Sequence, residues 1–123
     1  MDKDAKIQEL KDRIKKFCEE RDWDQFHGAK ELAIGIVTEA SEILEYFRFK
    51  SDKEVEEIFK NPEKKGHISE ELADILYNVL RIAQKYKIDL SSELNKKMIK
   101  NEKRYPVSKA KGSNKRYNPK LNI

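Results

Sequence analysis

The sequence predicts an all-α fold with a four-helix core and a basic tail, and three observations lead to this class. Apolar residues recur at three- and four-residue steps along four segments, which is the spacing of one face of a helix. No segment alternates apolar and polar residues as a half-buried strand does. A chain of 123 residues is long enough for one hydrophobic core and too short for two. A single helical bundle is therefore expected.

The first two helices are predicted from apolar periodicity. The first spans residues 3–20 and the second about 29–49. Between them, the segment RDWDQFHG at 21–28 interrupts the pattern with clustered aromatic residues and a glycine, which predicts a loop ending near Gly28. The apolar side of the first helix carries Ile7, Leu10, Ile14 and Phe17, and that of the second carries Leu32, Ala33, Ile36, Val37, Ala40, Ile43, Leu44 and Phe47.

The second half of the chain predicts two further helices. Segment 51–67 is polar and contains Pro62 and Gly66, so we expect one short helical turn around Val55–Phe59 and then a loop. Ser69 is expected to cap a third helix that runs to about Tyr86. A fourth helix begins near Leu90 or Ser91, and Pro106 ends it. Residues 107–123 are rich in Lys and Asn, which predicts an all-α domain at 1–106 followed by an extended basic arm at 107–123.

Charge is distributed unevenly along the chain. The formal net charge is +4, from 27 Lys and Arg and 23 Asp and Glu. Residues 95–123 hold ten of the basic residues and one of the acidic ones, so this part carries +9 and the remainder carries −5. A basic tail on an acidic body is typical of nucleic-acid binding, of an RNA-coated partner, or of a cationic arm over a small phosphorylated ligand.

The expected setting is the cytoplasm. No apolar run approaches the ~18 residues that a membrane span needs, so we expect no membrane partner. The N-terminus MDKDAKIQEL is too charged for a signal peptide. The single cysteine, Cys18, excludes an intrachain disulfide framework and a cysteine-based zinc site, which favours a reducing compartment.

Two pairs of carboxylates lie on the two most apolar helices. Glu39 and Glu42 share the edge of the apolar side of the second helix, and Glu71 and Asp74 share a strip of the third. Acidic pairs at this spacing occur six times in the chain, and in so charged a protein such a pair is usually a solvated face. On a partly buried flank, however, two like charges are costly unless a cation compensates them. Gly35, one turn before Glu39, also leaves space beside the first pair.

Four carboxylates without His or Cys suit Mg²⁺, for which Mn²⁺ can substitute. Mg²⁺ keeps several waters and is usually shared with substrate phosphates, so the pattern predicts phosphate-ester or phosphoanhydride chemistry. The metal would polarise phosphoryl oxygens and lower the pKa of a bound water. Glu39 or Glu42 would then act as general base. The sequence has no Gly-rich phosphate loop, so Lys and Arg are expected to bind the phosphates.

EASE at 39–42 followed by EELAD at 70–74 forms the arrangement E-x-x-E, a spacer, and E-x-x-D. This arrangement resembles the MazG-like all-α nucleoside triphosphate pyrophosphohydrolases, and within them the dCTP pyrophosphatase branch. The closer likeness, over about residues 10–117, rests on RDWDQFHGAKEL at 21–32, ILEYFRFKS at 43–51, and NKKMIKNEKRYP with KGSNKRY near the C-terminus.

The resemblance implies roles for individual residues. Glu39, Glu42, Glu71 and Asp74 match the metal ligands. The segment that lines the nucleotide site matches Trp23, Asp24, Gln25, Phe26 and His27. Phe49 would stack on the base, and Asn78 matches a sugar-contacting position that is Tyr in animal dCTP pyrophosphatases. The candidates for the phosphate side are Lys96, Lys100, Asn101, Arg104 and Tyr105.

Each of these residues also has a simpler interpretation. Trp23 and Phe26 would be core aromatics where a loop closes over the bundle, and Phe49 would be plain packing. His27 would be a hydrogen-bonding residue at a helix start, and the run KNEKRY would be a solvated helix face.

The predicted function is Mg²⁺-dependent hydrolysis of a nucleoside triphosphate to the monophosphate and pyrophosphate. The resemblance implies a pyrimidine deoxynucleotide such as dCTP or a modified form as substrate, and a role in cleansing the nucleotide pool. It also implies a homo-oligomer, a dimer or a tetramer, with which the broad apolar faces agree. One alternative is a basic helical nucleic-acid-binding protein that uses residues 95–123, although it leaves Gly35 and the carboxylate pairs unexplained. The other is a catalytically silent nucleotide-binding regulatory module.

Overall fold

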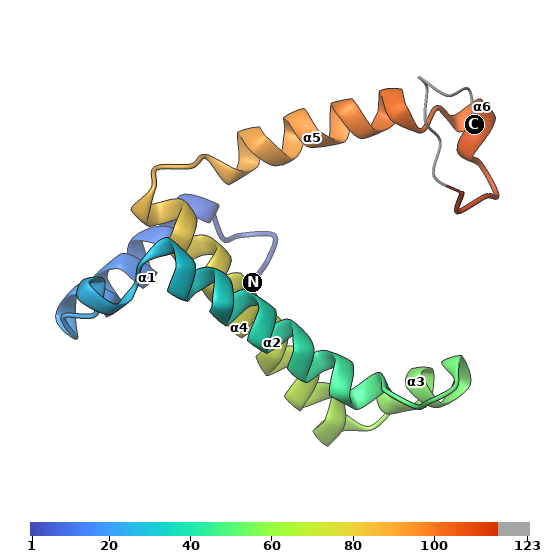
Figure 1. Ribbon diagram of the computed structural model, residues 1–123, viewed down its shortest axis with the longest axis horizontal. Coiled ribbons are helices and arrows are strands. Elements are labelled where there is room, and N and C mark those ends of the chain that lie inside the picture. The colour runs from blue at the N-terminus through green and yellow to red at the C-terminus, as the bar shows by residue number, and fades with distance from the viewer. Residues whose placement is uncertain (116–123) are drawn as a thin grey trace. The chain divides into compact units, whose positions relative to one another are not determined.

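The computed structural model describes residues 1–115, and its regular structure is helical (Figure 1). Within these residues no strand occurs, so the predicted all-α class is confirmed. The elements in chain order are α1 Ile7–Glu20, the 3₁₀ helix η1 Asp24–Phe26, α2 Ala29–Phe47, α3 Asp52–Ile58, α4 Pro62–Lys85, α5 Leu90–Arg104 and α6 Val107–Ala110.

The contacts divide the chain into two units, Met1–Lys87 and a second that begins at Ile88. In the first unit α2 lies lengthwise along α4, and α1 packs against α4 (Figure 1). The apolar core is small, and its buried side chains are Cys18, Leu32, Ile58, Ile68, Leu80 and Ala83. The division at residue 88 does not test the domain boundary predicted at residue 106, which stays a prediction.

Helix α4 is longer than predicted, because the loop expected over Pro62–Gly66 is helical. Asn61 caps the helix, since its side-chain oxygen accepts a hydrogen bond from the Lys64 backbone N–H at 3.1 Å. Proline is favoured at the first helical position, where its missing N–H has no helical partner to lose. Ser69, the predicted cap, lies inside the helix, and its hydroxyl donates to the Lys65 carbonyl at 2.8 Å. The added turns bring Ile68 into the core, where it is buried.

The other helix boundaries lie close to the predicted ones. Helix α1 begins at Ile7, one turn later than predicted, because Lys6 has an extended backbone. Helix α2 ends at Phe47, and α3 forms where a short helical turn was expected. The Ser51 hydroxyl caps α3 by accepting from the Glu54 backbone N–H at 3.2 Å.

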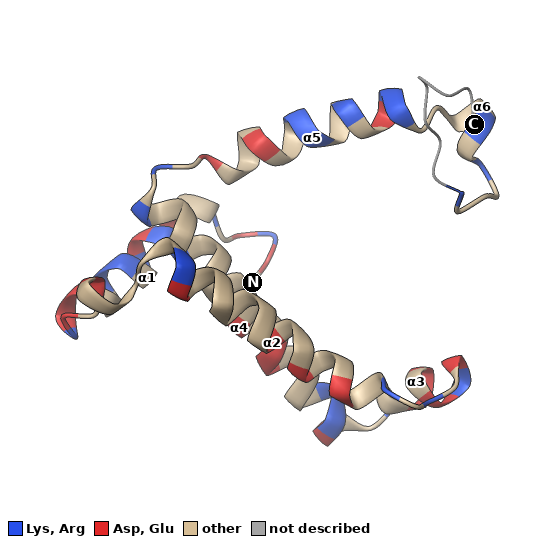
Figure 2. Cartoon of the chain, in the orientation of Figure 1, with Lys and Arg blue, Asp and Glu red and all other residues tan. Residues whose placement is uncertain are grey.

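The second unit contains α5 and α6. Asp89 caps α5 by accepting from the Ser92 backbone N–H at 2.8 Å. Lys and Arg recur along α5 (Figure 2). The arm predicted from residue 107 starts with the short helix α6, so its first residues are not extended. The rest of the predicted arm from residue 116 lies outside the described residues.

Among residues 1–115, no helix combines the length and the apolar character that a membrane crossing requires.

Candidate metal centre and nucleotide site

Three carboxylates converge where α2 faces α4. Glu39 and Glu42 lie one turn apart on α2, and Glu71 reaches toward them from α4. One oxygen of each side chain lies within 4.8 Å of the others. Glu39 and Glu71 are half-buried and Glu42 is exposed. Acidic residues stand on both helices of this pair in Figure 2. Residues from two separate helices, Glu42 and Glu71 among them, thus form one acidic cluster.

This cluster has no cationic partner within the described chain. None of the ion pairs formed by residues 1–115 includes Glu39, Glu42 or Glu71. The Glu71 Oε2 atom is buried and receives no hydrogen bond. A buried, ionised carboxylate oxygen without a donor is unfavourable. The cluster therefore calls for either a cation or a proton.

Without a cation, Glu71 is the group that keeps the proton. Hydrogen bonding to Glu39 and Glu42, together with partial burial and repulsion between the charges, raises the pKa of Glu71 to about 8. A protonated Glu71 carries no charge and donates its one O–H to a neighbouring carboxylate, which relieves the repulsion. A divalent cation with oxygen ligands does the same with all three groups ionised.

Asp74, the fourth predicted ligand, lies outside the group of three. Its side chain is exposed, and its backbone carbonyl accepts a hydrogen bond from the Asn78 amide at 2.9 Å. The other side of this amide lies against Gly35, where an added Cβ would stand 2.6 Å from Asn78 Oδ1. The space that Gly35 leaves beside the acidic pair is therefore filled by Asn78 of the same chain. The ligand role of Asp74 and the sugar contact of Asn78 stay predictions.

The loop between α1 and α2 presents its aromatic side chains near the surface. Trp23 packs edge-on against Phe17, with ring centroids 5.5 Å apart, and against the His27 ring at 5.8 Å. Phe26 is 62% exposed, so it is not a core aromatic. The Gln25 amide donates to the carbonyl and carboxylate of Asp22, which has a left-handed backbone at φ 54°.

Two members of this loop are tied to α4. Asp24 forms an ion pair with Arg81, and the hydrogen bond from Arg81 lowers the pKa of the Asp24 carboxyl. His27 Nδ1 accepts from Arg81 Nε at 3.2 Å. The side chain of His27 does not cap α2, whose N-cap residue is Gly28. Aromatic stacking and core packing do not describe the whole loop, because an ion pair and a hydrogen bond to Arg81 hold Asp24 and His27 against α4.

Phe49 stands just beyond α2 and is 91% exposed. Its φ of 63° is a left-handed conformation, which is unfavourable for a bulky residue. The guanidinium of Arg48 lies over the ring, 4.6 Å from its centroid. An exposed aromatic held in a strained conformation is a feature of ligand-contacting positions. Packing within this chain does not account for the exposed ring, and its stacking on a base stays a prediction.

The candidates for the phosphate side belong to the second unit. Lys96 and Lys100 are exposed on α5, and Lys96 is paired with Glu93 at 3.2 Å. Asn101 and Arg104 are half-buried, and the Arg104 guanidinium lies over the Tyr105 ring, 5.6 Å from its centroid. Their part in a phosphate site stays a prediction.

Sequence reasoning did not predict the buried cation of this region. Arg81 is 1% exposed, and none of the sequence motifs marked it as a buried residue. Lys85, one turn later, donates to the backbone carbonyls of Asp24 and His27. A sequence signal existed, since a basic pair at i, i+4 follows the most apolar stretch of the helix. The loop partners of Arg81 and Lys85 are Asp24 and His27, which lie more than fifty residues earlier in the chain. Apolar periodicity could not identify such distant partners.

Two packed helices that bring three uncompensated carboxylates together define an all-α protein with a candidate divalent-metal site. The model of the MazG-like family matches residues 34–119. The chain belongs to the MazG-like family, and the resemblance expected from its motifs is confirmed.

Individual relatives agree with this family. The chain is 37% identical over 97 residues to dCTP pyrophosphatase 1 of Bos taurus, covering 79% of this chain and 57% of that protein. It is 35% identical over 101 residues to dCTP pyrophosphatase 1 of Homo sapiens, covering 82% and 59%. The crystal structure of a pyrophosphatase from Archaeoglobus fulgidus matches with a TM-score of 0.75 and 35% identity, covering 80% of this chain and 91% of that one. The chain thus spans a little over half the length of the two mammalian proteins.

Proposed function

We propose that this protein hydrolyses a nucleoside triphosphate between its α and β phosphates, releasing the monophosphate and pyrophosphate. The observation that carries the proposal is the convergence of Glu39, Glu42 and Glu71, with a buried Glu71 oxygen that has no hydrogen-bond donor among residues 1–115. The names of the relatives, dCTP pyrophosphatase 1 and pyrophosphatase, support a reaction of this class.

The donor set fits Mg²⁺, with Mn²⁺ as a substitute, because every ligand is a carboxylate oxygen. Glu39, Glu42 and Glu71 would hold the ion, and Asp74, one turn beyond Glu71, is the proposed fourth ligand. When bound, such an ion neutralises phosphate charge and lowers the pKa of a coordinated water.

Either Glu39 or Glu42 would remove the proton from the attacking water. Glu42 is the more exposed of the two, so water reaches its carboxylate most directly. A carboxylate is an effective base here when it is ionised and within hydrogen-bond reach of the water. Glu71 would instead be engaged by the ion, because its buried Oε2 has no hydrogen-bond donor among the described residues.

We propose a pyrimidine deoxynucleotide such as dCTP, or a modified form of one, as the substrate, and removal of unwanted nucleotides from the pool as the role. The names of the mammalian relatives support the base. Phe49 and Trp23 are exposed enough to stack on a base. Such stacking contributes about 1–3 kcal/mol per base.

We also propose a homo-oligomer, a dimer or a tetramer, in the cytoplasm. Large apolar side chains are exposed on both long helices, namely Ile34, Val37, Leu44, Leu72 and Leu76. A groove of about 340 Å³ lies on α1 and α4, lined by Leu10, Arg13, Ile14, Phe17, Ala73, Leu76, Tyr77 and Leu80. A second copy would cover such surfaces. The single cysteine, Cys18, which is buried, agrees with a reducing compartment.

A pyrophosphate-release screen tests the function. The protein is incubated with Mg²⁺ and each common or modified nucleoside triphosphate, and we expect pyrophosphate and the monophosphate as products. Glu42→Gln should abolish turnover and keep the fold, whereas Glu31→Gln, an exposed glutamate in the first turn of α2, should leave turnover unchanged. Nucleotide binding without product would indicate the silent regulatory module. Salt-sensitive binding to random DNA that ignores Mg²⁺ would indicate the nucleic-acid-binding alternative.

A further inference from the structure

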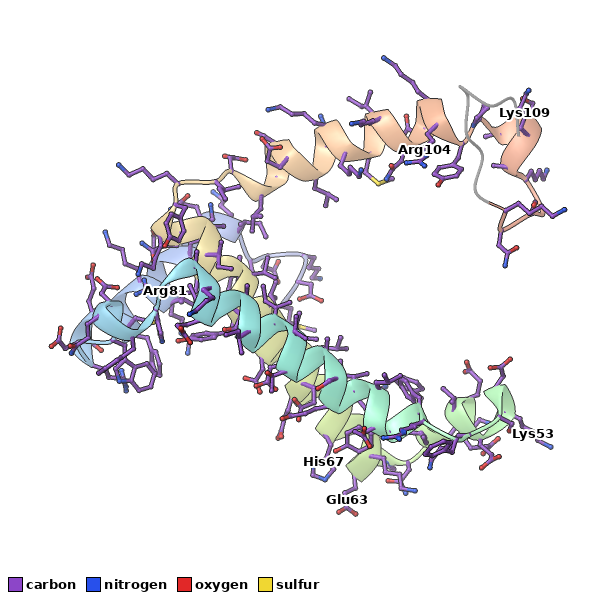
Figure 3. All side chains as sticks on the ribbon, viewed as in Figure 1. Lys53, Glu63, His67, Arg81, Arg104 and Lys109 are labelled. Carbon is purple, nitrogen blue, oxygen red and sulfur yellow. The ribbon has the colours of Figure 1, made fainter. Side chains whose placement is uncertain are left out.

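A buried arginine joins α4 to the aromatic loop. Arg81 donates through one terminal nitrogen to Asp24 and through the other to Gln84, and its Nε donates to His27 Nδ1 at 3.2 Å. One turn later, Lys85 donates to the backbone carbonyls of Asp24 and His27. Figure 3 labels Arg81 on this part of α4, away from His67 and Glu63 at the other end of the helix. Every edge of the guanidinium is thus used on residues outside the acidic cluster.

Stability alone does not explain this arrangement. Burying a guanidinium is costly, and replacing a buried ion pair by well-packed apolar residues is often neutral or stabilising. The Asp24 side chain that pairs with Arg81 is 57% exposed, so only one of the two charges in this ion pair is buried. The effect of Arg81 is geometric. Its planar guanidinium holds Asp24, His27 and Gln84 in fixed directions.

The same contact decides the protonation of His27. An arginine Nε carries its hydrogen at all accessible pH values, so His27 Nδ1 must accept. The hydrogen of the neutral ring is then on Nε2. Partial burial and the charges of Arg81 and Lys85 lower the pKa of His27, against the opposite effect of Asp24. His27 is therefore a neutral imidazole that offers an Nε2–H donor.

We propose that Arg81 is a positioning residue, which fixes the turn Asp24–Phe26 on α4 and presents His27 as a neutral Nε2–H donor beside Trp23. The Trp23 and His27 rings meet edge to face with centroids 5.8 Å apart, so orienting one ring orients the other. The inference rests on the proposed function, in which this loop lines the nucleotide site. A neutral donor matches an uncharged acceptor, such as the carbonyl oxygen of a pyrimidine base.

The tautomer is measured without any turnover. Long-range ¹H–¹⁵N spectra of the full chain distinguish Nδ1–H from Nε2–H imidazoles, and with only two histidines present His67 serves as the internal reference. We expect His27 to be neutral and Nε2-protonated at pH 7, and Arg81→Lys to give a mixture of tautomers. An Nδ1–H tautomer in the unmodified protein would overturn the inference.

Kinetics test the positioning role. Arg81→Lys keeps the charge and removes the fork, so we expect KM for the nucleotide to rise on the order of tenfold while kcat changes less than about threefold. Asp24→Asn, at an exposed partner, should shift KM in the same direction and covers the case in which Arg81→Lys does not fold. Glu19→Gln, exposed on α1 and paired with Lys15, is the control. An unchanged KM in a folded Arg81→Lys or in Asp24→Asn would also overturn the inference.

The two sets of measurements distinguish a failure of the proposed function from a failure of the positioning role of Arg81. If the unmodified protein hydrolyses no triphosphate, the pyrophosphatase assignment falls and the tautomer measurement still decides what Arg81 does to His27. If hydrolysis is normal and the variants match the unmodified protein, the function stands and the positioning role falls.

Discussion

The amide of Asn78 on α4 lies against the backbone of Gly35 on α2, so closely that a methyl group at residue 35 would stand 2.6 Å from Oδ1. The amide cannot turn away freely, because its nitrogen donates to the Asp74 carbonyl at 2.9 Å. Gly35 precedes Glu39 by one helical turn, and Asn78 follows Asp74 by one. The contact therefore sets the approach of the two helices next to the acidic cluster.

Gly35→Ala should impair nucleotide binding more than folding. The new methyl displaces Asn78, and the lost hydrogen bond offsets the ~1 kcal/mol that alanine gains over glycine in a helix. We expect the free energy of unfolding, measured in urea, to stay within about 1 kcal/mol of the unmodified value, and KM to rise. The double variant with Asn78→Ala, which removes all three contacting atoms, should be no worse than Asn78→Ala alone. Additive losses would show that the two residues act separately.

The metal-free protein should lose stability as pH rises from about 5 to 8. The pKa of Glu71 is about 8 in the folded chain, against an ordinary value of 4.5, so the folded state binds the extra proton in this range. Stability that depends on this proton is present at low pH and is lost as pH approaches 8. The measurement is Tm against pH in EDTA, for the unmodified protein and Glu71→Gln. The difference between the two curves isolates Glu71, and a difference that does not vary with pH would contradict the prediction.

Mg²⁺ should compete with that proton. Binding of the ion releases the proton of Glu71, so the apparent affinity for Mg²⁺ should increase with pH up to about 8. Isothermal titration in two buffers of different ionisation enthalpy counts the protons released. No proton release at pH 6 would show that Glu71 is already ionised or is not a ligand.

Neutralising one acidic residue should stabilise the metal-free chain. Glu39→Gln removes like-charge repulsion in the cluster, so we expect a higher Tm in EDTA and no increase in Tm on adding Mg²⁺. In the unmodified protein, Mg²⁺ at a hundred times its Kd should contribute ~2.7 kcal/mol. The control is again Glu31→Gln, which should retain the full metal-induced shift. A metal-induced shift in Glu39→Gln equal to that of the unmodified protein would remove Glu39 from the ligand set.

Phe49→Ala should weaken nucleotide binding and leave the fold intact. The ring is 91% exposed, so its removal costs little burial. Loss of base stacking should raise KM on the order of tenfold, with little change in kcat. Phe49→Trp should retain a low KM because it keeps an aromatic face. Steady-state kinetics with dCTP measure both, and an unchanged KM in Phe49→Ala would contradict the stacking role.

A charge on the exposed side of α2 should dissociate the oligomer. Val37 and Leu44 lie seven residues apart on this side, and both are exposed in the single chain. Val37→Glu should therefore lower the mass measured by light scattering to that of the monomer. Lys53→Glu on α3, labelled in Figure 3, is the control and should keep the mass of the unmodified protein. A monomeric unmodified protein would contradict the oligomer outright.

The helices and the pairing of Glu39 with Glu42 in the acidic cluster could be read from the sequence, because both depend on local spacing. Apolar periodicity placed α1, α2 and α5 within about one turn. It failed at Pro62–Gly66, where two residues that usually interrupt helices stand at a capped helix start and in an early turn. The i, i+3 spacing also put Glu39 beside Glu42 on one face, since that relation is fixed by the pitch of one helix.

The sequence by itself determined the helical class, the acidic pairs and the aromatic loop, because each is a property of neighbouring residues in one segment. Only the tertiary structure decided that Glu71 joins Glu39 and Glu42 while Asp74 does not, and that Asn78 fills the space beside Gly35. It also decided that Arg81 is buried between α4 and the loop. These relations depend on the rotation and distance of one helix against another, and packing across the whole chain sets both.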